Sequence, residues 1–144
     1  MNLAIFDLDN TLLDGDSDYN WGLFLAQEGF VDKKNHQALN DKFYADYNAG
    51  KLDIYEFTEF QFKFFKNNPR KLLDKLLARF IDEVAEAMIT EKARNLVAQH
   101  RNNGDKLLII TATNSYITKP IGNLLGIDDL IGTDLEEVNG EFTG

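Results

Sequence analysis

The segment Asp7-Leu8-Asp9-Asn10-Thr11 places two carboxylates directly after the short apolar run Leu3 to Phe6. An apolar run of this length, bounded by polar residues, predicts a buried β-strand. Ligands in open α/β sheets bind at the carboxyl ends of strands, so function is expected where these acids lie. If the chain stays extended, Asp7 and Asp9 point to the same face. Two like charges held so close need a cation, a shared proton or a positive substrate group.

The same pattern occurs a second time further along the chain. The apolar run Leu107 to Ile110 predicts a second buried strand, and the small polar residues Thr111 to Ser115 follow it. Leu130 to Gly132 predicts a third short strand, and Asn139-Gly140 predicts a hairpin turn. Helical segments between the strands indicate a parallel sheet with right-handed crossovers. We therefore expect an α/β fold with a Rossmann-like parallel sheet core of about three strands plus a hairpin.

No strand pattern interrupts the segment from Asp16 to Met88, which therefore predicts an all-helical insert. Capping and stop residues predict four helices in this insert. The first runs from Asp16 or Ser17 to about Glu28, and the second from about Lys33 to Asn48. The third starts at a cap formed by Asp53, and the fourth runs from Asn68-Pro69 to Met88. Two further helices are expected outside the insert, one capped by Thr90 and stopped by Gly104, and one that starts between Ser115 and Thr118 and closes near Gly126.

The third helix of the insert carries an unusual number of aromatic rings, at positions Tyr55, Phe57, Phe60, Phe62, Phe64 and Phe65. So many rings cannot lie on one stripe of a helix. One interpretation is that they form the core of a small helical domain, because aromatic side chains dominate buried area. The alternative is that some of them line the mouth of a substrate pocket.

Composition excludes several classes of function. The 24 acidic residues outnumber the 15 basic ones and give a net charge of −9, which argues against general nucleic-acid binding. A phosphorylated substrate would need a local cationic site, most simply a divalent metal. The chain has no cysteine, so disulfides and thiolate zinc sites are excluded. No stretch approaches the length of a membrane span, and no basic leader precedes the first strand, so we expect a cytosolic protein.

The motif Asp-x-Asp-x-Thr at the end of a first strand resembles motif one of the haloacid dehalogenase superfamily. The longer stretch FDLDNTLLDGDS, from Phe6 to Ser17, resembles the branch that contains phosphoserine phosphatase. In that branch a helical cap is inserted directly after the motif. The resemblance implies a core formed by residues 1–15 and 89–144 and a helical cap formed by residues 16–88.

The resemblance also implies roles for individual residues. Asp7 would be the nucleophile that becomes an aspartyl phosphate, and Asp9 would be the general acid/base. Mg²⁺ would take a side-chain oxygen of Asp7 and the main-chain carbonyl of Asp9. Thr111 corresponds to the hydroxyl that binds the transferring phosphate. Free N–H groups, those of Ala112 or of a helix start, can also hold an anion there. Asp16 corresponds to an acidic position that contacts the substrate amine in phosphoserine phosphatase, although a role as a helix cap explains it equally well.

Two motifs of the family do not occur within these 144 residues. The third supplies a lysine that stabilises the phosphoaspartate, and the fourth, Gly-Asp-x-x-x-Asp, supplies further metal ligands on the next strand. Without them we expect weak metal binding. We also expect Leu3 to Leu8 to expose an apolar sheet edge, which invites pairing with a second copy or with a completing polypeptide.

We therefore expect a Mg²⁺-dependent phosphomonoester hydrolase that acts through an aspartyl phosphate on a small phosphorylated metabolite similar to phosphoserine, with a chain that is truncated or completed by another polypeptide. A second hypothesis is a phosphate-binding or interaction domain without catalysis. A third is a receiver-like signalling domain that accepts a phosphoryl group, which the long helical insert after the first strand disfavours.

Overall fold

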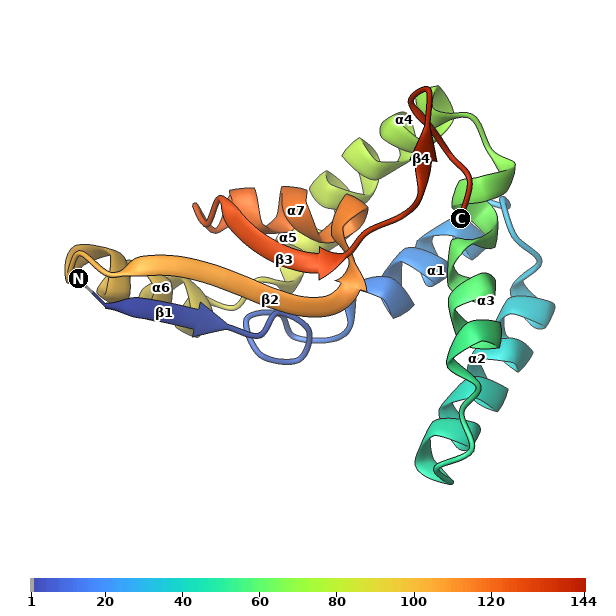
Figure 1. Ribbon diagram of the computed structural model, residues 1–144, viewed down its shortest axis with the longest axis horizontal. Coiled ribbons are helices and arrows are strands. Elements are labelled where there is room, and N and C mark those ends of the chain that lie inside the picture. The colour runs from blue at the N-terminus through green and yellow to red at the C-terminus, as the bar shows by residue number, and fades with distance from the viewer. Residues whose placement is uncertain (1) are drawn as a thin grey trace.

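The computed structural model describes residues 2–144 and has a mixed α/β architecture (Figure 1). The strands are β1 (Leu3–Phe6), β2 (Lys106–Asn114), β3 (Asp129–Thr133), β4 (Glu137–Val138) and β5 (Glu141–Phe142). The helices are α1 (Ser17–Gln27), α2 (Lys33–Asn48), α3 (Ile54–Asn67), α4 (Arg70–Phe80), the π-helical segment η1 (Ile81–Ala85), α5 (Glu86–Met88), α6 (Glu91–Asn102) and α7 (Ser115–Leu124). No helix in this described range is both long and apolar enough to cross a membrane.

The first three strands form a parallel sheet in the order β1-β2-β3, as predicted. Phe6 pairs with Ile109, and Ile110 pairs with Ile131, so the carboxyl ends of the three strands meet at one edge. Strands β4 and β5 form a separate antiparallel pair around Asn139-Gly140, where both residues have positive φ (53° and 82°), as a two-residue hairpin turn requires. The predicted fold class is therefore confirmed.

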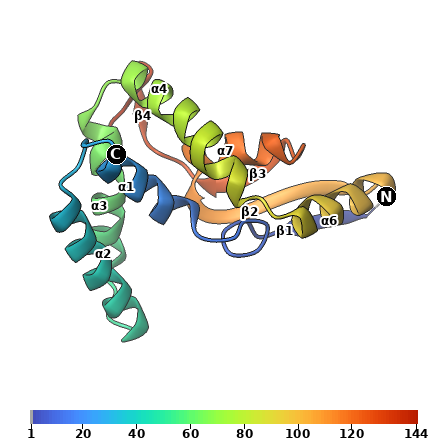
Figure 2. The same ribbon diagram turned by 180° about the vertical axis from the view of Figure 1, so that it is seen from behind.

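The two faces of the sheet are covered to different extents. Helices α6 and α7 lie over one face, which Figure 2 shows from the helical side. Phe6 and Ile109 are buried beneath these helices. The opposite face carries exposed apolar side chains, among them Ile5 and Ile131 (56% and 58% exposed). Strand β1 lies at an edge of the sheet, as expected, and leaves the apolar side chain of Leu3 exposed.

The helical insert leaves and returns to the sheet at one point. Leu13 and Ile89 form an isolated antiparallel bridge, and the Asp14 N–H donates to the Met88 carbonyl at 2.8 Å. Helix α1 follows this neck, and beyond it α2 and α3 extend side by side away from the sheet (Figure 1). The expected boundaries of the core and the cap coincide with this neck, and the division into two units stays a prediction.

The hydrophobic core is continuous from the sheet into the insert. Trp21 of α1 stacks on Phe65 of α3, with ring centroids 5.8 Å apart and an interplanar angle of 2°. Phe80 of α4 meets Trp21 edge-on at 5.3 Å. Phe65 also contacts Tyr116 and Phe142, so one fully buried ring joins α3 to α7 and to the hairpin. Such aromatic contacts stabilise the packing beyond their buried area.

Local sequence signals account for most of the element boundaries. The carboxylate of Asp53 accepts from the N–H groups of Tyr55 and Glu56 at the start of α3, and the Thr90 hydroxyl accepts from the Ala93 N–H at the start of α6. These caps were predicted because such side chains satisfy free N–H groups of the first turn.

One strand boundary and the interior of one helix differ from the expectation. Strand β2 continues to Asn114, four residues beyond the predicted end at Ile110, and its pairing with β3 shifts register in that extension. The segment predicted as one helix up to Met88 is continuous, but it contains the π-helical turn Ile81–Ala85. The Asn114 side chain caps α7, which therefore starts at Ser115.

Candidate active site

The loop after β1 is compact and does not continue the extended path. Leu8 is fully buried, and its carbonyl accepts hydrogen bonds from three N–H groups, those of Thr11, Leu12 and Leu13, at 3.2, 3.0 and 3.0 Å. Asn10 adopts a left-handed conformation (φ 57°), which asparagine tolerates better than most residues. The buried Leu8 thus anchors the loop and leaves the acids on either side of it more accessible.

Asp7 is exposed at the end of β1. Its Oδ2 accepts a hydrogen bond from the Thr11 hydroxyl at 2.9 Å. Its Oδ1 has no hydrogen-bond donor among residues 2–144. The threonine of the motif therefore orients one oxygen of the carboxylate and leaves the other available to a ligand.

Asp9 connects three elements. Its Oδ1 accepts from the Ser17 N–H at 2.7 Å, at the start of α1. Its Oδ2 accepts from the Thr113 hydroxyl at 2.6 Å, near the end of β2. Both oxygens of this half-buried carboxylate are thus oriented by groups from outside its own loop. This pair of bonds brings the polar ends of β1 and β2 into one site.

Thr111 and Ala112 lie within β2 rather than after it, because the strand extends to Asn114. The Thr111 hydroxyl, on a residue only 9% exposed, accepts from the Thr113 N–H at 3.1 Å. Thr111 is thereby joined through Thr113 to Asp9. The Ala112 carbonyl accepts from the Thr133 hydroxyl at 2.7 Å, so Ala112 faces the neighbouring strand β3.

Asp16 caps α1, since its Oδ1 accepts from the Tyr19 N–H at 2.9 Å. The capping role predicted for it is confirmed. Burial raises the pKa of Asp16 above its ordinary value, and the negative charge of Asp9 contributes to the same shift. The substrate contact implied by the family resemblance stays a prediction.

The oxygens of the loop after β1 fit a small, hard cation only in part. No group of three or more histidine, cysteine, aspartate or glutamate side chains in residues 2–144 has the arrangement of a metal site. Asp7 Oδ1 and the Asp9 carbonyl have no hydrogen-bond donor within that range. These are the two oxygen donors implied for Mg²⁺, a cation that binds through one or two carboxylates and keeps several waters.

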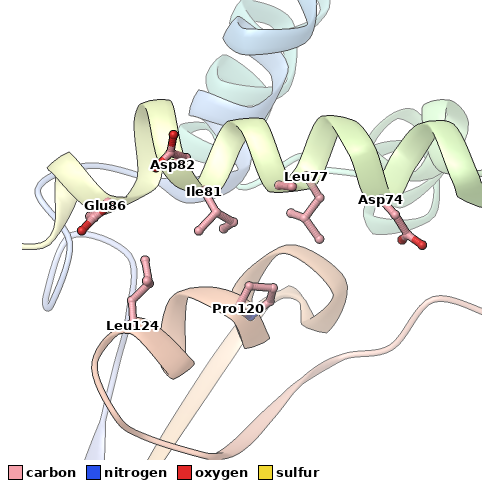
Figure 3. Close-up of a pocket in the computed structure, with 8 residues that line it drawn as sticks. Asp74, Leu77, Ile81, Asp82, Glu86, Pro120 and Leu124 are labelled. Carbon is pink, nitrogen blue, oxygen red and sulfur yellow. The ribbon is translucent and has the colours of Figure 1, made fainter.

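None of the five predicted site residues lines either of the two pockets described for residues 2–144. A pocket of about 350 Å³ lies between α4 and α7, with Leu77, Ile81 and Leu124 at its apolar surface (Figure 3). A cavity of about 1310 Å³ lies among α1, α2 and α3, and Asp18 lines it. Asp18 follows Ser17, the residue whose N–H binds Asp9, so the first turn of α1 joins the cavity to the acids.

The aromatic rings of α3 divide between the two interpretations. Phe65 is fully buried in the core, which supports the structural interpretation. Phe60, Phe62 and Phe64 are half-buried and line the cavity. Phe62 and Phe64 also pack against the hydrophobic core, so only Phe60 favours the pocket interpretation alone. Tyr55 is 84% exposed, although it too borders the cavity.

Thr113 was grouped with the other small polar residues after the predicted strand, and Ser17 was considered only as a helix cap. No role was predicted for Asp18. The two-residue spacing of Thr111 and Thr113 on a strand was a signal that both could face the same site. For Ser17 and Asp18 no comparable signal exists, because the first turn of a helix often carries small and acidic residues for capping alone.

Comparison with known proteins assigns the chain to a family. The model of haloacid dehalogenase-like hydrolases matches residues 4–144. A histidinol-phosphatase from Neisseria meningitidis is 41% identical over 99% of this chain and 65% of its own length. A phosphoserine phosphatase from Mycobacterium tuberculosis is 28% identical over 98% of this chain and 47% of its own length. The chain thus spans less than two thirds of these relatives.

Solved structures agree with this assignment. A protein of unknown function from Bordetella pertussis Tohama I superposes with a TM-score of 0.91 and 36% identity, over 99% of this chain and 64% of that one. A phosphoserine phosphatase that carries a phospho-aspartyl intermediate analogue shares the fold, with a TM-score of 0.63 and 19% identity over 99% of this chain and 60% of that one. The motif residues, the parallel sheet and the matched family model agree, and the chain belongs to the haloacid dehalogenase-like hydrolase family.

Proposed function

We propose that this protein is a Mg²⁺-dependent phosphomonoester hydrolase in which Asp7 is the nucleophile. The observation that carries the proposal is the double hydrogen bonding of Asp9, because it brings the loop after β1 and the end of β2 into one site. Two carboxylates and a strand-end hydroxyl are the groups that phosphoryl transfer needs, since that reaction depends mainly on positioning and charge stabilisation.

The reaction divides into two displacements. An oxygen of Asp7 attacks phosphorus, the bond from phosphorus to the ester oxygen breaks, and the departing alcohol takes a proton from Asp9. Water then attacks the phosphorus of the aspartyl phosphate and gives a proton to Asp9, which releases phosphate and restores Asp7. Thr11 orients Asp7, and Thr113 orients Asp9. We assign the binding of a phosphate oxygen to Thr111, which is joined to Asp9 through Thr113.

Magnesium, when bound by an Asp7 oxygen and the Asp9 carbonyl, would offset the negative charge that a phosphate brings to two acids. The chain's own contribution is that residues 2–144 donate no hydrogen bond to either of those two oxygens. Among the relatives, one is a histidinol-phosphatase and another a phosphoserine phosphatase. We infer that the substrate here is likewise a small phosphorylated metabolite. As a separate proposal, we place the protein in the cytosol.

The test is a Mg²⁺-dependent assay of the full-length protein on a chromogenic phosphomonoester. Asp7→Asn is expected to lower kcat by at least about 1,000-fold, because the amide lacks the attacking oxygen anion. Asp14→Asn, which changes an exposed acid a few residues away, is expected to keep kcat within about twofold. Retention of a tenth of the activity by Asp7→Asn would contradict the proposal. Phosphate binding by the unmodified protein without turnover would favour the binding-domain hypothesis instead.

We also propose that the edge strand β1 pairs with a further strand, from a second copy or from a completing polypeptide. Leu3 and Ile5 of this edge strand are 55% and 56% exposed, and exposed apolar edge strands favour association. Sedimentation of these 144 residues should detect dimers or poor solubility, and Ile5→Lys should reduce both. A stable monomer without that substitution would argue against the pairing.

A further inference from the structure

The end of β2 departs from regular sheet pairing where it carries Thr113. Three residues of β2, 111–113, lie opposite the single residue Gly132 of β3, because the pairing between the two strands shifts register there. Extra residues on one strand form a bulge, which bends the strand and changes the direction of its side chains. We call residues 111–113 the β2 bulge. The regular sheet ladder therefore does not by itself set the direction of the Thr113 hydroxyl that binds Asp9.

Gly132 gives the β2 bulge room to approach β3. The φ angle of this residue is not positive, so its backbone conformation does not require glycine. A Cβ atom at this position would lie 3.0 Å from the carbonyl oxygen of Thr113 and 3.5 Å from the Cα atom of Ser115. Glycine within a strand often marks such a close approach of another backbone segment. Any larger residue here would push the backbone of Thr113 away from β3.

Asn114 fixes the other end of the β2 bulge. Helix α7 begins at Ser115, directly after β2 and without a connecting loop. Asn114 Oδ1 accepts from the Ile117 N–H at 3.0 Å, and the Asn114 carbonyl accepts from the Thr118 hydroxyl at 2.8 Å. Asn114 is only 3% exposed, so water has little access to replace these bonds if they are lost. The first turn of α7 thereby holds the residue that follows Thr113.

The held segment presents one hydroxyl to Asp9. Within the β2 bulge the Thr113 N–H donates to the Thr111 hydroxyl at 3.1 Å, a local side-chain bond to the backbone. The Thr113 hydroxyl donates to Asp9 Oδ2 at 2.6 Å. Catalysis by a general acid depends on its position relative to the leaving oxygen, and a displacement of about 1 Å can cost about 100-fold in rate. The position of the β2 bulge therefore affects the carboxylate that must transfer a proton.

We propose that Asn114 and Gly132 are positioning residues for Asp9, because together they hold the β2 bulge so that the Thr113 hydroxyl fixes the direction of the Asp9 carboxylate. The proposal rests on the proposed function, in which Asp9 protonates the departing alcohol. Both residues act through Thr113 rather than on the reacting atoms. Their substitution should therefore impair proton transfer to the leaving group more than the attack of Asp7 on phosphorus.

The kinetic test compares two leaving groups on the full-length protein with Mg²⁺. The alcohol of 3-phenylpropyl phosphate needs a proton to depart, whereas 4-nitrophenyl phosphate releases a weakly basic phenolate that does not. Asn114→Ala and Gly132→Ala should each lower kcat/KM by about 10- to 100-fold on the alkyl ester and by less than about threefold on the nitrophenyl ester. Asn114→Ser keeps a capping oxygen and should restore most of the rate. Equal losses on both esters, or no loss on either, would overturn the proposal.

Two control variants match the structural cost of these substitutions away from Asp9. Asp53→Ala removes a helix cap of the same kind, at the start of α3 in the insert. Gly122→Ala adds a Cβ atom 3.1 Å from the Ile127 carbonyl oxygen, near the other end of α7. Each control should keep the ratio of the two kcat/KM values within about twofold of the unmodified protein. A control that changes this ratio as much as Asn114→Ala would show a general effect of destabilisation and overturn the proposal.

Crystal structures of the unmodified protein and of the two test variants separate this inference from the proposed function. We expect Thr113 Oγ1 and Asp9 Oδ2 to lie 2.6 Å apart in the unmodified protein and more than about 3.5 Å apart in Asn114→Ala and Gly132→Ala. A bond retained in both variants would refute the positioning roles, whatever the activity. Loss of the bond in variants of a protein that hydrolyses neither ester would support the positioning of Asp9 and refute the hydrolase.

Discussion

Asp9 and Asp18 lie close together, yet their surroundings differ in kind. Asp9 uses both carboxylate oxygens as hydrogen-bond acceptors, from the Ser17 N–H and from the Thr113 hydroxyl. Asp18 accepts one side-chain hydrogen bond, from Gln61, and borders a large cavity. In that cavity the Trp21 N–H has no acceptor within the described residues.

The difference indicates a division of labour between the sheet and the insert. At the sheet edge the protein satisfies Asp9 with its own groups, so its orientation is set before a ligand binds, which favours chemistry. In the helical insert, the buried donors Trp21 Nε1 and Asn40 Nδ2 have no acceptor among the described residues. Substitutions at Phe65, Asp18 and Thr113 test whether the two regions are coupled and whether the two acids differ in this way.

Phe65→Ala should have the largest effect, because this fully buried ring joins the insert to α7 and the hairpin. We expect the free energy of unfolding to fall by about 3–5 kcal/mol, measured by urea denaturation. Tyr55→Ala on the same helix removes a ring that is 84% exposed and should change it by less than about 0.5 kcal/mol. A small effect of Phe65→Ala would show that the two regions are stabilised independently.

Asp18→Asn should change how stability depends on pH. The pKa of Asp18 is raised from 3.8 to about 7 in the folded protein. Between these values the folded state binds more protons, so the free energy of unfolding falls as pH rises through that window. Asparagine does not titrate, so the variant lacks this loss. The difference in free energy of unfolding, variant minus unmodified protein, should therefore be up to about 4 kcal/mol larger at pH 8 than at pH 4.

The measurement for Asp18 is urea denaturation at pH 4 and pH 8. The unmodified protein serves as the reference at both pH values. If the stability difference between Asp18→Asn and this reference is the same at both, burial does not perturb Asp18, and the contrast with Asp9 fails.

Thr113→Val tests the bond that brings Asp9 to β2. Loss of the hydroxyl removes one of the two groups that orient Asp9, and we expect kcat to fall by about 10- to 100-fold, equivalent to about 1.4–2.8 kcal/mol. Thr113→Ser keeps the hydroxyl and should restore most of the rate. Thr133→Val removes the hydroxyl that binds the Ala112 carbonyl on the neighbouring strand and should stay within about threefold. Equal losses in the two valine variants would indicate a general effect on the sheet edge.

The sequence was sufficient for the parts of the fold that depend on local signals. Capping by Asp53 and Thr90 and the turn at Asn139-Gly140 each rest on residues a few positions apart, and each is confirmed. The parallel sheet followed from apolar runs separated by helices. The first motif could be recognised for the same reason, since its residues are adjacent in the chain.

Contacts between distant segments could not be predicted in this way. The bond between Asp18 and Gln61 joins residues 43 positions apart, and the bond between Asp9 and Thr113 joins residues 104 positions apart. The extension of β2 to Asn114 depends on its pairing with β3, where the register shifts. Small polar residues such as Thr111 read as the end of a strand when the neighbouring strand is unknown.

The most direct test of the account is to identify the residue that carries phosphate during turnover. The full-length protein would be quenched with substrate and Mg²⁺, reduced with borohydride and analysed by peptide mass spectrometry, since reduction converts an aspartyl phosphate to homoserine. We predict substrate-dependent homoserine at position 7 and none at position 9. Turnover without modification at Asp7, or modification at another residue, would contradict the assignment of Asp7 as the nucleophile.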